Sequence, residues 1–177
     1  MEFSFKPSSA LLVIDMLNDF IKQDGTLVVP GAERIIPKVL EILNEARRAA
    51  VPVIYVADAH LPDDSEFEVW PIHALQDEWG GEVIEELAPL KGDFVIKKRR
   101  YSAFFGTDLD LLLRERGMRH LYLTGVLTNI CIYATALDAG MRGYGVSVFR
   151  DGVASLSVET DRFVFSQLTE VLRAELI

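Results

Sequence analysis

The chain has 177 residues, half of them hydrophobic, and its net charge is −9. This length fits a single domain, which we expect to span residues 1–177, and the apolar content is sufficient for one core. The acidic balance argues against nucleic-acid binding, which usually needs a basic face, and no apolar run approaches the length of a membrane span. One cysteine permits no disulfide within the chain, and residues 1–9 lack the pattern of a secretory signal, so we expect a cytoplasmic protein.

Short apolar runs alternate with longer amphipathic segments along the chain. Taken in chain order, the predicted elements are a strand at 10–14, a helix at 33–50, a strand at 53–57, a short helix at 82–87, a strand at 94–97, a helix at 109–116, a strand at 121–124, a helix at 130–141, a strand at 146–149, a helix at 159–172 and a strand at 174–177. Continuous apolar strands that alternate with helices predict an α/β fold with a parallel sheet covered on both faces. Residues 59–81 form a long irregular region, and such regions within a compact domain usually carry function.

Polar residues follow four of the predicted strands at the point where each strand ends. They are Asp15, Asp58 with His60, Lys98, and Cys131, which comes after the turn that follows residues 121–124. Because ligands of open parallel sheets bind outside the carboxyl ends of the strands, these side chains are expected to converge on one edge of the sheet. The strand pattern therefore predicts a functional site at this edge.

Cys131 lies where a helical pattern begins. A helix N-terminus stabilises a thiolate through its free N–H groups and its partial positive charge, so Cys131 is a candidate nucleophile. The alternative is an inert buried thiol, which is the usual fate of a free cysteine. The local sequence is compatible with both interpretations.

Asp15 is the better candidate general base for this thiol, because the histidine nearest in sequence, His120, lies at the wrong end of its strand. The alternative role for Asp15 is to cap the turn that follows it. A cation such as Lys98 would hold the carboxylate and the thiolate in place, although lysines in basic runs are mostly solvated. Backbone N–H groups around Leu127 and Cys131 are candidate donors to an oxyanion.

A second group of candidate residues surrounds the second strand end. Asp58 and His60 are two positions apart, so their side chains face the same way. His73 follows across the irregular region, with Glu66 between them. Carboxylate and imidazole ligands suit zinc, manganese or iron, but a D-x-H pattern also occurs often by chance.

Along almost its whole length, the chain resembles the isochorismatase-like cysteine hydrolases. The matching segments are LVID at 12–15 with NDF at 18–20, KRRYSAF at 98–104 with GTDL at 106–109, TGVLTNIC at 124–131, TALDA at 135–139 and DGVAS at 151–155. The resemblance implies a three-layer α/β/α sandwich with a six-stranded parallel sheet. It also implies a catalytic triad of Asp15, Lys98 and Cys131, and a cis peptide bond between Val126 and Leu127.

Within this family, the irregular region is most similar to that of nicotinamidases, which carry Asp-x-His and then aromatic-Pro-x-His. Here these motifs are Asp58-Ala59-His60 and Trp70-Pro71-Ile72-His73. The resemblance implies one divalent metal ion, zinc before manganese or iron, held by Asp58, His60 and His73. Glu66 is an additional candidate ligand, because some nicotinamidases have a glutamate seven residues before the last histidine.

The implied reaction is hydrolysis of nicotinamide to nicotinate and ammonia through a thioester on Cys131. Phe20, Trp70 and Tyr101 would line the pocket for the pyridine ring, and the metal would hold the ring nitrogen. Asp15 would accept the thiol proton, and the N–H groups of Leu127 and Cys131 would receive the oxyanion. Family members are commonly dimers or larger, so we expect a homo-oligomer that binds a small molecule.

Two alternatives stay open. One is a related amidase that acts on another small amide, of the N-carbamoylsarcosine, ureidoacrylate or maleamate type; such relatives generally lack the metal ligands. The other is a non-catalytic binding protein on the same fold, since a fold alone does not assign a function. The presence of all three triad residues argues against the second alternative, and Cys131 argues against isochorismatase activity, because true isochorismatases typically lack this cysteine.

Overall fold

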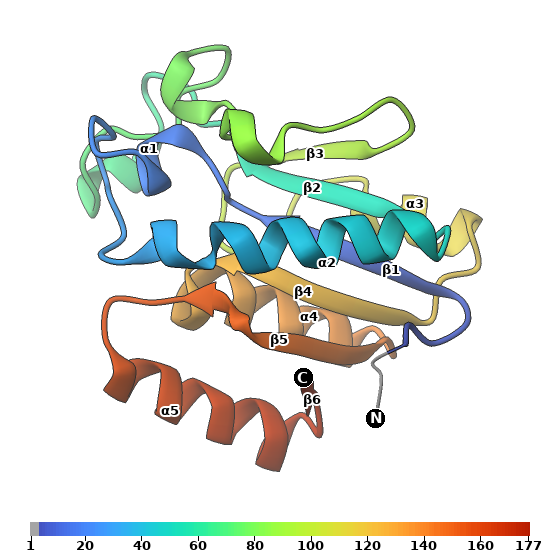
Figure 1. Ribbon diagram of the computed structural model, residues 1–177. Coiled ribbons are helices and arrows are strands. Elements are labelled where there is room, and N and C mark those ends of the chain that lie inside the picture. The colour runs from blue at the N-terminus through green and yellow to red at the C-terminus, as the bar shows by residue number, and fades with distance from the viewer. Residues whose placement is uncertain (1–3) are drawn as a thin grey trace.

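All strands of the structure run parallel in one sheet, in the order β3-β2-β1-β4-β5-β6 (Figure 1). The computed structural model describes residues 4–177. The strands are β1 (Ser9–Ile14), β2 (Val53–Asp58), β3 (Phe94–Lys98), β4 (His120–Val126), β5 (Gly145–Ala154) and β6 (Glu175–Leu176). The predicted six-stranded parallel sheet is confirmed, with β5 longer than the predicted strand at 146–149.

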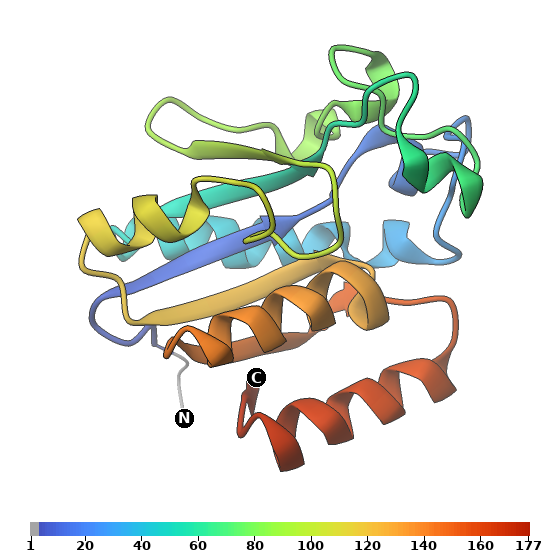
Figure 2. The same cartoon turned by 180° about the vertical axis from the view of Figure 1, so that it is seen from behind.

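Helices cover both faces of the sheet, so the fold is the expected three-layer α/β/α sandwich (Figure 1, Figure 2). The larger helices are α2 (Ile36–Arg48), α3 (Leu109–Glu115), α4 (Tyr133–Met141) and α5 (Val158–Ser166). Side chains of β1 alternate between the two cores, as they must on a pleated strand. Leu11 and Val13 lie in the cluster that α2 covers, whereas Leu12 and Ile14 lie in the cluster with α3, α4 and α5.

The helices differ from the predicted ranges where backbone pairing or proline intervenes. Residues 33–35 form a 3₁₀ turn before α2, and α2 begins next to Pro37, whose fixed φ suits the first turn of a helix. The short helix predicted at 82–87 was wrong: only Glu85–Leu87 forms a 3₁₀ turn. The backbone there is held by pairing with residues 16–18 instead, through Asn18 N–Glu82 O (3.0 Å) and Ile84 N–Met16 O (3.0 Å) hydrogen bonds. The helix α1 (Asn18–Ile21) was not predicted.

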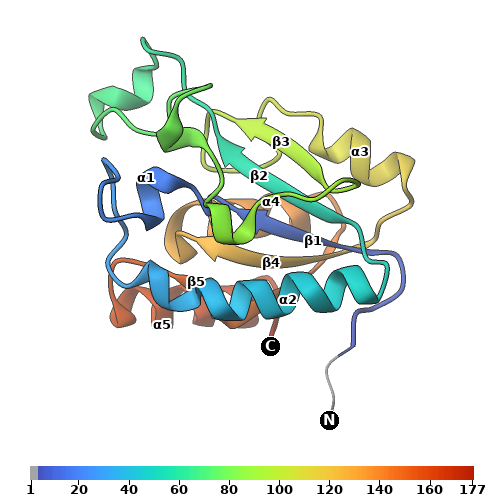
Figure 3. The ribbon, with the colours of Figure 1, turned by 45° about the horizontal axis from the view of Figure 1, so that its top comes forward.

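The order of the strands creates a crevice between the ends of β1 and β4. The chain passes outward from β1 to β2 and β3, and then returns to the opposite side of β1 as β4. In open α/β sheets, ligands bind at such a switch point, beyond the carboxyl ends of the strands. Figure 3 shows α1 and the region after β2 at this end of the sheet. The predicted irregular region 59–81 is largely confirmed, with short 3₁₀ turns at Ser65–Glu68 and Trp79–Gly81.

No helix within residues 4–177 has the length and apolar character needed to span a bilayer.

Gly125, near the end of β4, allows the two central strands to approach closely. Its φ is +116°, and a Cβ atom at this position would lie 1.9 Å from the backbone oxygen of Ile14. Backbone atoms of a central strand have no room to move, so Gly125→Ala should lower the free energy of unfolding by about 3 kcal/mol or prevent folding. Chemical denaturation measures this. Gly92→Ala is the matched control, because Gly92 has a similar φ of +107° with no atom within 4 Å of the added Cβ. Equal losses in the two variants would contradict the packing argument.

Candidate active site

The structure brings Asp15, Lys98 and Cys131 together at the switch point. The Lys98 side chain is fully buried, and its Nζ lies 2.8 Å from Asp15 Oδ2 and 3.5 Å from Cys131 Sγ. Lys98 Nζ also donates to Asp58 Oδ1, and the backbone N–H of Asp58 donates to Asp15 Oδ1 at 2.9 Å. The ammonium group of Lys98 is therefore enclosed by two carboxylates and the thiol, which excludes the solvated alternative for this lysine.

Each member of this cluster comes from the end of a different strand. Asp15 follows β1 directly, in a left-handed backbone conformation with φ +53°, a conformation that aspartate tolerates better than most residues. Asp58 and Lys98 are the last residues of β2 and β3. Cys131 lies in a π-helical turn, Thr128–Ile132, that continues from β4 into α4. The strand-end argument thus predicted which residues meet, since parallel neighbours end at the same edge.

Burial and charge interactions together decide the protonation of the groups in this site. Burial alone would lower the pKa of Lys98, but the attraction of Asp15 and Asp58 outweighs it and places that pKa well above its usual value. Burial and then repulsion from Asp58 raise the pKa of Asp15 to about 6, with Lys98 opposing both. Asp15 is therefore ionised at neutral pH and close to its own pKa, which suits a group that must accept and return a proton.

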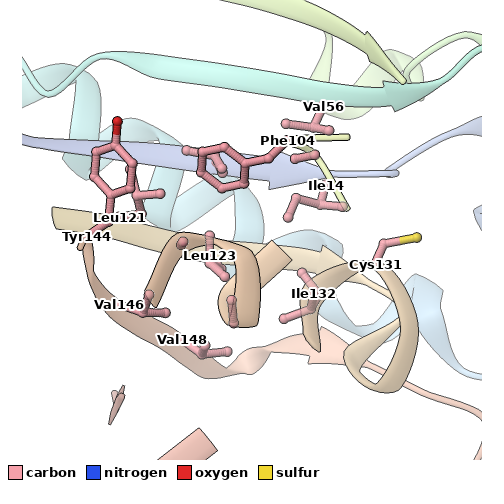
Figure 4. Packing of buried hydrophobic residues seen from close by; sticks show 14 of the residues in the cluster. Ile14, Val56, Phe104, Leu121, Leu123, Cys131, Ile132, Tyr144, Val146 and Val148 are labelled. Carbon is pink, nitrogen blue, oxygen red and sulfur yellow. The ribbon is translucent and has the colours of Figure 1, made fainter. Parts of the chain in front are cut away.

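Cys131 differs from the expectation that a helix N-terminus would make it a thiolate. Burial raises the pKa of the Cys131 thiol well above its usual value; Lys98 opposes this shift, and Asp15 and Asp58 add to it. Figure 4 shows its sulfur at the border of the hydrophobic cluster that contains Ile14 and Ile132. The resting side chain is a neutral thiol, so its proton must leave during the attack, with Asp15 as the nearby acceptor.

The pH dependence of alkylation tests this state of the thiol. For the metal-free protein, the rate of iodoacetamide modification should keep rising as the pH increases beyond 9, because only the thiolate reacts and its fraction grows with pH below the pKa. Cys131 is the only cysteine, so intact mass spectrometry follows this thiol alone. A rate that levels off below pH 8 would show instead that the thiolate is already formed at neutral pH.

Asp58, His60 and His73 form a compact group of buried potential metal ligands. One ligand atom from each lies within 4.8 Å of the other two. The Nε2 atom of His60 is buried without a hydrogen-bond partner, although it lies 3.8 Å from Asp58 Oδ2 and 3.9 Å from Glu66 Oε1. A buried imidazole nitrogen that faces two carboxylates is an arrangement that a divalent cation would satisfy, so these residues fit such an ion.

The backbone of the irregular region places the two histidines side by side. The N–H of His60 donates to Ala74 O (3.0 Å), and the N–H of Gln76 donates to His60 O (2.9 Å), so both ends of the region are paired. The imidazole centroids of His60 and His73 are 4.9 Å apart. Asp19 holds the backbone next to His73, because its Oδ2 accepts the N–H of Ala74 at 2.7 Å.

A cavity that opens to solvent on one side lies between the thiol and the metal-ligand group. The three predicted ring-binding residues, Phe20, Trp70 and Tyr101, all line it, and Trp70 Nε1 donates to the Tyr101 hydroxyl at 3.1 Å. Sequence reasoning did not identify the other apolar residues of the wall: Leu27, Val28, Val29, Ile130 and Leu156. They are apolar positions in loops and turns, and nothing in their local pattern distinguishes them from core residues.

The peptide bond between Val126 and Leu127 is cis, at the position that the resemblance implied. Leu127 and Cys131 both line the cavity. The turn that carries the thiol therefore forms part of the wall of the cavity.

Comparisons with known proteins agree with this architecture. The family described as isochorismatase domain matches residues 9–175. A pyrazinamidase/nicotinamidase from Streptococcus mutans is 36% identical, with a TM-score of 0.92 over 96% of this chain and 100% of that one. N-carbamoylsarcosine amidase from Thermoplasma acidophilum is 38% identical, with a TM-score of 0.88 over 96% and 95%. A pyrazinamidase of Pyrococcus horikoshii in complex with zinc is 31% identical, with a TM-score of 0.91 over 97% and 99%.

A thiol, a lysine and an aspartate buried together at the switch point of a three-layer α/β/α fold form the arrangement that the resemblance to isochorismatase-like cysteine hydrolases implied. The chain belongs to the isochorismatase family, and the members of that family to which it is similar include amidases.

Proposed function

We propose that this chain, as a single domain over residues 1–177, is a metal-dependent nicotinamidase that hydrolyses nicotinamide to nicotinate and ammonia. The observation that carries this proposal is the character of the cavity wall. Apart from the thiol, the metal-ligand group and Glu66, the wall consists of apolar and aromatic side chains, among them Phe20, Trp70 and Tyr101. Such a wall suits a flat, uncharged ring.

The same wall argues against the alternative amides. N-carbamoylsarcosine, ureidoacrylate and maleamate each carry a carboxylate, which needs a cationic partner in a buried site. Among the described residues that line the cavity there is no lysine or arginine, whereas Asp58 and Glu66 are both acidic. The cations at the end of β3 are already engaged: Lys98 by Asp15 and Asp58, and Arg99 and Arg100 by Asp64.

The triad residues can perform both halves of the reaction. Asp15 accepts the thiol proton while the Cys131 sulfur bonds to the amide carbon, and the N–H groups of Leu127 and Cys131 donate to the oxyanion. Asp15 then returns that proton to the departing amine, which leaves as ammonia, and a thioester remains. In the second half, Asp15 takes a proton from a water molecule as the water oxygen attacks the thioester carbon. Asp15 then returns this proton to the Cys131 sulfur as the thioester bond breaks. Throughout, the ammonium group of Lys98 keeps the Asp15 carboxylate oriented.

The metal would be held by Asp58, His60 and His73, with Glu66 as a further candidate; Glu66 Oε1 lies 3.9 Å from His60 Nε2. When bound, it supplies a Lewis-acid site for the ring nitrogen and so orients the amide toward the thiol. The zinc complex of the Pyrococcus horikoshii relative supports zinc as the ion. Because Cys131 must remain a free thiol, we also propose a reducing compartment, the cytoplasm.

Ammonia release tests the proposal. The protein as purified, the protein after dialysis against a chelator, and the same protein after zinc is restored are each assayed with nicotinamide and with the three carboxylated amides. We expect that the rate of ammonia release from nicotinamide falls by at least about tenfold on chelation and returns with zinc. Even the loss of a residue that only supports a metal ligand typically costs about 10- to 100-fold in metal affinity or activity. Faster ammonia release from a carboxylated amide would contradict nicotinamide as the substrate. An unchanged rate after confirmed metal removal would contradict the metal dependence.

A further inference from the structure

Asp64 is a buried carboxylate in the irregular region, next to the metal-ligand group but not part of it. Its side chain is 0% exposed, whereas the neighbouring Asp63 is exposed. Four groups surround its two oxygens. Oδ2 lies 3.1 Å from His60 Nδ1 and accepts from Arg99 Nε at 2.8 Å; Oδ1 accepts from Arg100 Nη1 at 2.8 Å and from the backbone N–H of Glu66 at 3.2 Å.

This arrangement determines the role of each nitrogen of the His60 ring. A carboxylate between two arginines is an acceptor only, so the Nδ1 atom that faces it must carry the proton. When the single proton of a neutral imidazole is on Nδ1, Nε2 has a free lone pair. Nε2 is the buried atom without a hydrogen-bond partner, and it points to the same space as Asp58 and His73.

We propose that Asp64 is a positioning residue for metal binding, which fixes His60 in the tautomer and orientation that present Nε2 to the ion. This inference rests on the metal dependence in the proposed function, but it does not depend on the substrate. Carboxylates that hold the second nitrogen of a ligating histidine raise the affinity of metal sites by about 10- to 100-fold.

The two arginines extend this role from the irregular region to the triad. Arg99 and Arg100 directly follow Lys98, so the carboxylate that holds His60 also holds the segment that carries the triad lysine. They supply the positive charge that a buried carboxylate requires. If the role of Asp64 were only structural, it would consist of its pairing with Arg99 and Arg100. Substitution of the arginines tests this pairing separately from the contact of Asp64 with the His60 imidazole.

The test compares zinc affinity among four proteins, measured without substrate by competition with a chromophoric chelator. Asp64→Asn should bind zinc 10- to 100-fold more weakly than the wild type. Asp63→Asn, the matched control, should bind like the wild type. The double variant Arg99→Lys/Arg100→Lys, which keeps both positive charges and the carboxylate beside His60 but removes the guanidinium hydrogen bonds, should stay within about threefold of it. An unchanged affinity in Asp64→Asn, or an equal loss in the double arginine variant, would overturn the inference.

A second measurement keeps the inference testable if Asp64→Asn does not fold. Long-range ¹⁵N–¹H spectra of the metal-free wild type, at a pH where the imidazole is neutral, should show His60 protonated at Nδ1, and protonation at Nε2 would overturn the proposal. The substrate is tested independently of Asp64. A wild type that binds zinc but releases no ammonia from nicotinamide contradicts the proposed function and leaves the role of Asp64 intact.

Discussion

Cys131→Ala should reduce ammonia release from nicotinamide by at least about 10⁴-fold, because the variant has no atom that can form the thioester. Alanine fills part of the same apolar site beside Ile14 and Ile132, so the fold should persist. The measurement is the rate of ammonia release under saturating zinc, together with the melting temperature. Zinc binding should persist, since the substitution leaves Asp58, His60 and His73 in place.

Cys131→Ser sharpens the experiment. It preserves the shape of the site but replaces the sulfur with a much less acidic hydroxyl, so it should be nearly as inactive as the alanine variant. Retention of even a tenth of the wild-type rate in the alanine variant, which has no nucleophilic atom at this position, would contradict the thioester mechanism.

Lys98→Met should destabilise the protein by about 3–5 kcal/mol and also abolish activity. The substitution leaves Asp15 and Asp58 buried without the cation that lies 2.8 Å from Asp15, and breaking one side of a buried ion pair costs this much. Methionine has a similar length and no charge, so the loss reflects electrostatics rather than a cavity. Urea denaturation of the metal-free protein measures it.

A double variant separates stability from catalysis. Asp15→Asn combined with Lys98→Met removes one of the two unpaired carboxylates and should recover part of the lost stability, while activity stays absent because the general base is missing. If the double variant were less stable than Lys98→Met, repulsion between the buried carboxylates would not be the cause of the loss.

The positions of Asp15, Asp58 and Lys98 could be predicted because they depend only on where apolar strands end and on the rule that parallel neighbours end together. The state of Cys131 could not, because the pKa of a thiol depends on how much water and charge surround it. The helical pattern after Cys131 suggested a helix N-terminus that stabilises a thiolate, but the side chain is buried at the border of the core. The local sequence predicts the helix that follows Cys131, but only the packed structure shows how far the thiol is buried.

Asp64 illustrates a different limit. Its spacing of four residues from His60 is visible in the sequence, but many acidic residues stand near histidines without touching them. Its function becomes apparent only when Arg99 and Arg100, from the end of β3, are seen to converge on it. Likewise, Leu27 and Leu156 lie on segments far apart in the chain, and no local pattern places them in one wall.

The distribution of the triad over β1, β3 and β4 has a consequence for how the protein acquires activity. These strands are distant in sequence, and the pairing of β1 with β4 spans the intervening β2 and β3. Non-local pairings of this kind form slowly compared with helices. During refolding, helical circular dichroism should therefore recover before ammonia release does. The recovery of catalytic activity would then report when β1 and β4 pair in the central sheet, an event that helical circular dichroism hardly detects.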